Sequence, residues 1–233
     1  MRISVTIIAG KEKARIRDCL ERVKWADEVI VVHSSNADRT GEFAREYTDK
    51  VFCHEWPGYM VPQRRAALGY ATGEWVLAVD ADEYVTEELR EEILKVISST
   101  DPLDGYYIPR RNFFLGRWIK ECGWYPDYQL RLFKRSRGAV TDRKVHEGYI
   151  VKGPVGYLKG DLLHYTHPTI SETLSKINSM STKEAWEQAN RRRVKGRHLL
   201  LHPLAAFLNQ YFSRRGFREG TYGLMVSIIH AMT

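Results

Sequence analysis

The stretch that decides the fold is Glu74-Trp75-Val76-Leu77-Ala78-Val79-Asp80-Ala81-Asp82-Glu83. Residues 75–79 form a short apolar run without charges, which is typical of a strand buried on both faces of a sheet. The run ends abruptly in three carboxylates. Because ligands bind at the carboxyl ends of strands in an open α/β sheet, we expect Asp80, Asp82 and Glu83 to stand at the mouth of a cleft.

Two aspartates one residue apart suit a hard divalent cation such as Mg²⁺, with a substrate's phosphates completing its coordination. A D-x-D pattern arises by chance about once in a chain of this length, and it is then usually a solvated turn. Its place at the end of a buried strand, after several strand–helix units, favours a metal site at Asp80 and Asp82. Thr86 follows as the predicted N-cap of a helix, with Glu87 and Glu88 in the first turn.

The chain before this stretch alternates between apolar runs and helical periodicity. Strands are predicted at 3–8, 28–32 and 50–53, and helices at 14–24, 42–47 and 61–70. The short connections favour a mainly parallel, doubly wound sheet flanked by helices. Neither a G-x-G-x-x-G after the first strand nor a G-x-x-x-x-G-K-[ST] occurs, which counts against dinucleotide-binding and P-loop enzymes.

The second half of the chain has a different pattern of predicted elements. Strands are predicted at 105–109 and 128–134, separated by an aromatic, glycine-containing loop. From residue 170 the pattern predicts helices to about residue 193, around 199–213 and at 222–231. We therefore predict a first domain over 1–168 and a basic, amphipathic helical tail over 169–233.

Composition narrows the class of protein. With 233 residues and 43% hydrophobic content, the chain can build one large domain with an appendage. The three cysteines are scattered and form no C-x-x-C pair, so a reducing compartment is expected. Met1-Arg2 leads straight into the first predicted strand, so no signal peptide is expected. No apolar run approaches the ~20 residues that span a bilayer.

The net charge of +7 is concentrated near the end of the chain. From Ile170 to Thr233 there are ten Lys and Arg against four Glu, and Arg191 to Arg218 holds eight basic residues and no acidic one. Apolar and aromatic anchors over 199–212 follow the basic residues at 191–197. The pattern favours an in-plane helix on an anionic membrane surface. A helix packed on the first domain and a homodimer surface are the alternatives, and nucleic-acid binding is disfavoured because no recognised motif is present.

A series of motifs carries a resemblance to a known family. They are Ala26–Val32 (ADEVIVV), Asp38-Arg39-Thr40, Trp56–Tyr59 (WPGY), Gln63-Arg64, Ala71–Trp75 (ATGEW), Asp80–Glu83 (DADE), Tyr125–Phe133 (YPDYQLRLF) and Lys144–Gly148 (KVHEG). In this order they resemble the family 2 glycosyltransferases of the GT-A fold, above all the branch of bacterial lipopolysaccharide-core β-glucosyltransferases. The resemblance runs from residue 3 to about residue 166.

The resemblance implies a fold, a reaction and a place in the cell. The fold is GT-A, a Rossmann-like and mainly parallel sheet flanked by helices, here with a C-terminal helical extension. The reaction is an inverting transfer of a sugar from a nucleotide donor, UDP-sugar by default, to a hydroxyl of a glycan or lipid-linked acceptor in envelope polysaccharide synthesis. Mg²⁺ or Mn²⁺ is the implied cofactor. The implied location is cytoplasmic, peripheral at the inner face of the cell membrane.

The resemblance also implies roles for the metal and donor residues. Asp82 is expected to bind the metal directly, whereas Asp80 contacts the ribose or reaches the metal through water. Arg131 and Arg64 are candidates for holding the donor diphosphate, although Arg131 alternates with leucines and could simply face solvent. His164 could complete the metal site, with a hydrogen-bonded core histidine as the alternative.

Inversion further requires a general base that faces the acceptor hydroxyl. Asp127, in the aromatic loop, is the first candidate, and Glu147 is the alternative. Asp38 and His33 are assigned to donor binding by their places in the motifs.

Two positions depart from the family pattern. His33 stands where relatives usually carry an aspartate that reads the nucleotide base, and Lys11 falls within their Asn-Glu-Glu motif. A neutral imidazole either accepts or donates, whereas a carboxylate only accepts, so the donor stays open. Two further functions therefore remain as alternatives: a sugar-nucleotide nucleotidyltransferase, and a non-catalytic glycan- or nucleotide-binding relative.

Overall fold

The structure is a computed structural model that describes residues 2–10, 15–34, 39–55, 57–142, 147–189 and 196–232. The chain forms two compact units. The first comprises Met1–Arg110 and Tyr128–His164, and the second comprises Arg111–Asp127 and Tyr165–Thr233. The aromatic loop thus belongs to the same unit as the C-terminal helices. The division at residue 168 stays a prediction about domains, because compact units need not coincide with them.

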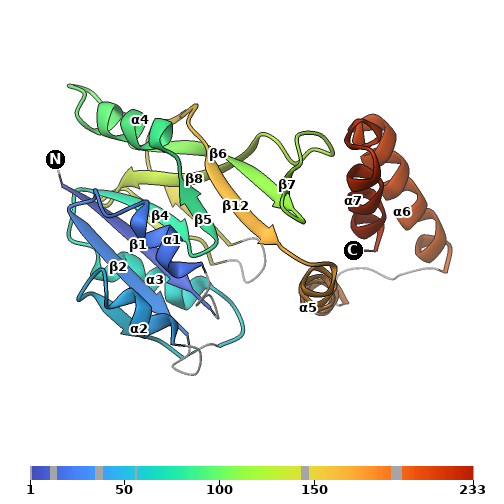
Figure 1. Ribbon diagram of the computed structural model, residues 1–233, viewed down its shortest axis with the longest axis horizontal. Coiled ribbons are helices and arrows are strands. Elements are labelled where there is room, and N and C mark those ends of the chain that lie inside the picture. The colour runs from blue at the N-terminus through green and yellow to red at the C-terminus, as the bar shows by residue number, and fades with distance from the viewer. Residues whose placement is uncertain are drawn as a thin grey trace. The chain divides into compact units, whose positions relative to one another are not determined.

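A ten-stranded sheet organises the fold (Figure 1). Its parallel part has the order β3-β2-β1-β4, formed by Val51–Cys53, Glu28–His33, Ile3–Ala9 and Trp75–Asp80. The order continues as β8-β6-β12-β5, formed by Asp127–Lys134, Gly105–Phe114, Leu162–His167 and Glu83–Val85. β8 pairs antiparallel with β4, so the sheet changes from parallel to mixed directly beside the aspartate strand.

Short strands complete this arrangement. β7 (Arg117–Trp118) pairs with β6 in antiparallel fashion, and β11 (Val155–Tyr157) pairs with it in parallel. β9 (Gly138–Val140) and β10 (Tyr149–Val151) form a separate two-stranded sheet.

The predicted strand–helix alternation is confirmed in the first unit. Its helices are α1 (Ile16–Glu21), α2 (Thr40–Ala44), α3 (Val61–Tyr70) and α4 (Glu87–Ile97). Residues 75–79 are buried, as expected for a strand covered on both faces. Alternate residues enter two cores: Leu77 packs with α1 and α4, whereas Val76 packs with α3 and the β9–β10 pair. The absence of charges in this run follows from that double burial.

Local signals place α4 where the sequence predicts it. The Thr86 hydroxyl accepts a hydrogen bond from the Leu89 backbone N–H at 3.2 Å, which confirms the predicted N-cap. Leu89, Ile93 and Ile97 form the buried face of the helix. Because this cap fixes where the helix begins, it also limits β5 and its carboxylates to the short segment before it.

A buried carboxylate at the start of β2 joins three segments of the first unit. Glu28 accepts from the Thr72 backbone N–H at 2.8 Å and from the Thr72 hydroxyl at 2.9 Å, and it also accepts from Ser4 and Lys50. Burial alone would raise the pKa of Glu28, but these donors lower it to about 2. The turn before β4 is therefore fixed to β1 and β2, which sets the register of the aspartate strand.

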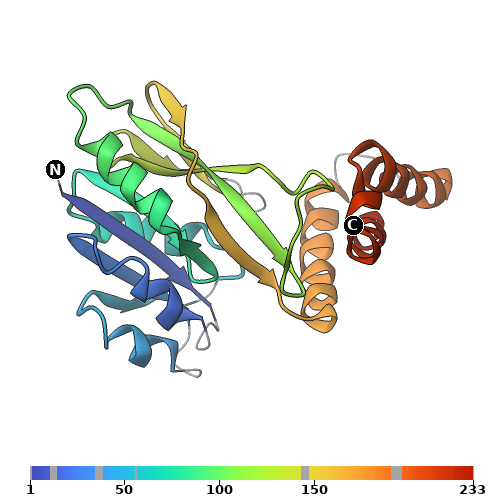
Figure 2. The same ribbon diagram turned by 45° about the horizontal axis from the view of Figure 1, so that its top comes forward.

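The second unit combines the loop 111–127 with helices. Its helices are α5 (Ile170–Ala189), α6 (Gly196–Leu208) and α7 (Thr221–Ala231), with a π-helical turn at Asn209–Ser213 and a 3-10 turn at Gly216–Glu219. The prediction of three C-terminal helices is confirmed. α6 and α7 lie side by side in both ribbon views (Figures 1 and 2).

This unit has its own small core. Phe114, Ile119 and Cys122 from the loop segment are buried together with Val226 from α7. Among the described residues, no helix is both long and apolar enough to cross a membrane.

Candidate active site

Asp80, the last residue of β4, is held by two arginines. Arg64 on α3 donates from Nη1 to Oδ1 at 2.9 Å and from Nη2 to Oδ2 at 3.2 Å. Arg131 on β8 donates from Nη2 to Oδ2 at 2.6 Å. The parallel register places Asp80 opposite Ile8, so this carboxylate lies at the carboxyl end of the parallel strands, as predicted.

Glu83 extends the cluster into the core. Its side chain is fully buried and accepts from Arg131 at 2.7 Å, from Arg110 at 3.0 Å and from the Asp80 backbone N–H at 3.0 Å. The expectation that Glu83 stands at the mouth of a cleft is therefore wrong. It follows the strand in sequence, but the turn directs it inward, where buried arginines satisfy its charge.

The cluster carries three cationic and two anionic groups, a net charge of +1. Burial would raise the pKa of Asp80, but the charges of Arg131 and Arg64 hold it well below the usual range. Burial would lower the pKa values of Arg64 and Arg131, but their carboxylate partners raise both. Each partner therefore stabilises the charged form of the others.

Asp82, two residues further on, has a different setting. Its Oδ2 lies 3.5 Å from Nε2 of His164, and the two side chains are 17% and 12% exposed. Antiparallel pairing of β12 with β5 sets His164 opposite Glu83, which brings the imidazole next to Asp82. The structure thus brings together two of the three residues proposed as metal ligands, and it commits the third, Asp80, to arginines.

This donor set is small. Among the described residues, no group of three or more His, Cys, Asp or Glu side chains could hold a metal ion. One carboxylate and one imidazole offer two protein ligands, which fits an ion that takes most of its ligands from a bound diphosphate and water.

The predicted donor residues His33, Arg64 and Arg131 are all buried. The side chain of His33 is completely buried, and a Cβ built at Gly41 would lie 2.5 Å from its Nε2. His33 therefore packs against α2, and its donor role stays a prediction. Arg64 and Arg131 are 6% and 5% exposed, so the alternative that Arg131 faces solvent is wrong.

The two candidate bases lie in different units. In the second unit, Asp127 Oδ2 accepts from Asn112 Nδ2 at 3.2 Å, and the same amide donates to the Trp124 carbonyl at 3.1 Å. In the first unit, Glu147 is partly buried just before β10. Asp38 lies outside the described residues. Both base assignments therefore stay predictions.

Sequence reasoning missed two residues that shape these sites, Arg110 and Asn112, and it placed a third, Glu83, at the mouth of a cleft instead of in the core. Arg110 and Glu83 complete the buried cluster, and Asn112 orients Asp127. The sequence offers one usable signal, since the polar run Arg110-Arg111-Asn112 interrupts an otherwise apolar and aromatic strand. Their partners come from segments that only the strand order brings together.

The fold and the aspartate strand define the class as a GT-A glycosyltransferase fold. Structures of S. aureus TarS 1–349 match it with a TM-score of 0.52 at 17% identity, covering 91% of this chain and 72% of that one. The complex of TarS 1–349 with UDP-GlcNAc matches with a TM-score of 0.53 at 15% identity, covering 97% and 79%. These likenesses concern the fold.

The chain belongs to glycosyl transferase family 2, whose model matches residues 4–149. It is 30% identical over 239 residues to the lipopolysaccharide core biosynthesis glycosyltransferase LpsC of Rhizobium meliloti, covering 99% of this chain and 87% of LpsC. It is 28% identical to the uncharacterized glycosyltransferase RP128 of Rickettsia prowazekii, covering 99% and 83%. The resemblance found in the sequence is confirmed, and the nucleotidyltransferase alternative is set aside.

The two aspartates should differ in what they contribute to stability. Asp80→Asn leaves Arg64 and Arg131 with an incomplete set of carboxylate partners, so it should lower the free energy of unfolding by about 3 kcal/mol. Asp82→Asn changes a partly exposed side chain outside the buried cluster and should cost less than about 1 kcal/mol. Urea unfolding followed by circular dichroism measures both. Equal losses would contradict the division of roles.

Proposed function

We propose that the protein transfers a sugar, with inversion, from a UDP-sugar to a hydroxyl of a lipopolysaccharide-core saccharide in a metal-dependent reaction. The observation that carries this proposal is the pair of Asp82 and His164 beside the cationic Asp80 cluster. Together they offer ligands for a divalent ion and positive charge at one strand end, which is what a nucleoside diphosphate leaving group needs.

Asp82 and His164 are the residues that would hold Mg²⁺ or Mn²⁺. When bound, the ion neutralises charge that develops on the departing diphosphate. The oxygen ligand of Asp82 suits either ion, and the imidazole favours Mn²⁺. Asp80 keeps both of its oxygens on Arg64 and Arg131, so its proposed role is to hold these arginines in place.

The buried arginines supply the second part of the mechanism. Their positions do not depend on a ligand, because Asp80 and Glu83 fix them in the folded protein. A guanidinium has five N–H donors, and Arg131 uses one of its NH₂ groups for both carboxylates. Such preorganised positive charge stabilises a leaving group without reorganisation during the reaction.

The donor and acceptor classes rest on relatives. TarS 1–349 forms a complex with UDP-GlcNAc, which supports a uridine nucleotide as the donor carrier. LpsC acts in lipopolysaccharide core biosynthesis, which supports a core saccharide as the acceptor. Asp127, oriented by Asn112, is the proposed base that removes the proton of the acceptor hydroxyl.

The C-terminal unit supports a peripheral membrane location. Leu201, Leu204, Leu208 and Phe212 recur every three or four residues and are 58%, 55%, 44% and 57% exposed. Such spacing sets them on one helical face, and the exposed residues Arg214, Arg215 and Arg218 follow directly. Of the other arginines in the basic run, residues 191–193 lie outside the described residues. An apolar face next to cations suits the surface of an anionic membrane.

Calorimetric titration with UDP, GDP, dTDP and ADP tests the donor site. We expect UDP to bind in the presence of Mn²⁺ and to bind at least tenfold more weakly when the metal is chelated or in Asp82→Ala, because the diphosphate would then lack the cation that offsets its charge. His164→Ala should weaken binding in the same direction. Binding that does not change in either variant would refute the proposed ligand pair.

Kinetics of the two carboxylate variants tests the base. With O-deacylated core saccharide as acceptor, Asp127→Asn should lower kcat by about 10²–10⁴-fold and leave UDP affinity unchanged. Glu147→Gln is the matched comparison and should retain most of the activity. The opposite ranking would transfer the role to Glu147.

Vesicle co-sedimentation tests the membrane location. The protein should bind vesicles that contain phosphatidylglycerol better than pure phosphatidylcholine vesicles, and added salt should weaken binding. The double variant Leu204→Asp, Leu208→Asp should bind at least tenfold more weakly, whereas the control Leu94→Asp on α4 should not. If the protein instead sediments as a dimer and does not bind vesicles, the exposed apolar face is a homodimer surface.

A further inference from the structure

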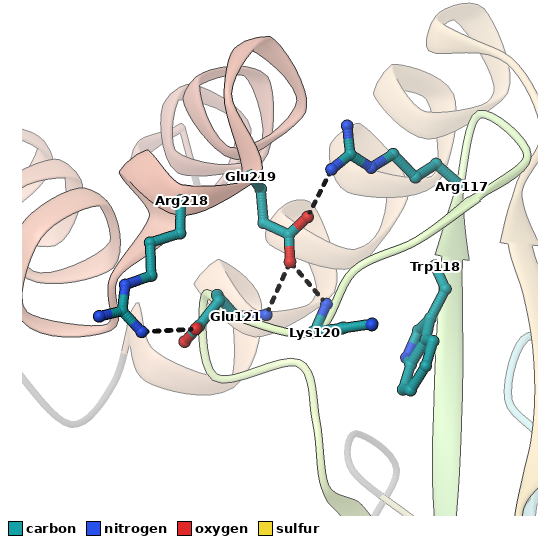
Figure 3. Close-up of a pocket in the computed structure, with 6 residues that line it drawn as sticks. All are labelled: Arg117, Trp118, Lys120, Glu121, Arg218 and Glu219. Carbon is teal, nitrogen blue, oxygen red and sulfur yellow. Dashed lines mark hydrogen bonds and ion pairs between the residues drawn. The ribbon is translucent and has the colours of Figure 1, made fainter.

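A pocket of about 450 Å³ lies entirely within the second unit. The aromatic loop contributes Arg117, Trp118, Lys120 and Glu121 to the pocket lining (Figure 3). The 3-10 turn at Gly216–Glu219 contributes Arg218 and Glu219. The size of the pocket falls within the usual range for small-molecule sites. Apart from Arg218, one of the cations beside the exposed apolar face, these residues take no part in the proposed donor site, base or membrane contact.

Glu219 builds the wall of this pocket. Its Oε1 accepts from the backbone N–H groups of Lys120 at 2.9 Å and Glu121 at 3.1 Å, and its Oε2 accepts from Arg117 Nη2 at 3.2 Å. Its side chain is only 7% exposed. A buried carboxylate with three donors fixes the loop backbone, so the shape of the pocket is established before any ligand binds.

The charges of the pocket leave one cationic group, the Lys120 ammonium, available to a ligand. Both carboxylates are engaged, Glu219 as described and Glu121 with Arg218 at 3.5 Å. The Lys120 ammonium lies 4.7 Å from the centroid of the Trp118 ring. Figure 3 shows Lys120 extending toward Trp118 and away from both carboxylates. Among the lining residues, Arg117 and Arg218 pair with the two carboxylates, so the Lys120 ammonium carries the net positive charge of the pocket.

This combination points to one class of ligand. An indole packs against the apolar face of a sugar ring, and Arg and Lys bind carboxylates or phosphates through charge-assisted hydrogen bonds. We propose that the pocket is an acceptor subsite that binds a saccharide bearing a negative charge, either a phosphate ester or a sugar acid. This inference rests on the proposed transfer to a saccharide, and it adds the acceptor's charge.

The location of the pocket residues in the sequence favours the acceptor, and not the donor, as the ligand. Lys120 and Glu121 belong to the same loop that ends at Asp127, the proposed base for the acceptor hydroxyl. The residues proposed for the metal and the diphosphate all belong to the first unit. Because the proposed donor residues and the pocket belong to different units, binding of the donor and of the acceptor can be measured independently.

The test follows Trp118 in the full-length protein. Trp residues are replaced by 5-fluorotryptophan, and the fluorine NMR signal of position 118 is identified by its loss in Trp118→Phe. Glucose 1-phosphate, glucuronate, neutral glucose and inorganic phosphate are then titrated in turn. At least one of the two anionic sugars should shift the Trp118 signal saturably, and whichever does so identifies the anionic group. Glucose and phosphate should each shift it far less at the same concentration.

Variants decide whether the lining residues carry the binding. Lys120→Gln should weaken binding of the anionic sugar by roughly tenfold, since it removes one charge-assisted hydrogen bond. Lys95→Gln on α4 is the matched control and should have no effect. The proposal is overturned if neither anionic sugar shifts the signal, if glucose or phosphate alone shifts it equally, or if Lys120→Gln binds like the wild type. The UDP titration detects failure of the donor site independently of this result.

Discussion

The rest of the structure depends on the buried ion cluster around Asp80 and Glu83. Removing two carboxylates from water is costly, and only the convergence of Arg64, Arg110 and Arg131 offsets that cost. These arginines come from α3, β6 and β8, so the cluster is complete only when helix, parallel strands and antiparallel strands are all in place. These charged groups are costly to remove from water, and their net charge of +1 also gives the carboxyl end of β4 a fixed positive electrostatic potential.

This cluster divides the D-x-D pair into two roles. Asp80 belongs to the folded core, whereas Asp82 reaches a partly exposed position beside His164. The two aspartates of the motif therefore differ in how much each contributes to the stability of the fold. The difference arises because β4 ends at Asp80, so Asp82 lies in the turn before β5 and meets different neighbours.

The fold of the first unit could be predicted because its signals are local. Double burial excludes charges from residues 75–79, and Thr86 marks the beginning of α4 without help from distant residues. The site could be predicted only in part. Arg131 alternates with leucines like a solvent-facing residue, and its burial follows from β8 pairing beside β4. Asn112 and Glu219 act through partners 15 and 102 residues away, a distance that no local pattern encodes.

The bond between Glu219 and the aromatic loop has a consequence for biosynthesis. Lys120 and Glu219 are 99 residues apart, so the loop leaves the ribosome roughly 5–20 s before its partner at ordinary translation rates. The segments from β1 to α4 follow one another directly and can pack as they emerge. A nascent chain therefore acquires its parallel sheet first and its supported loop last. Until Glu219 has been made, the loop of a partly synthesised chain lacks the carboxylate that holds its backbone.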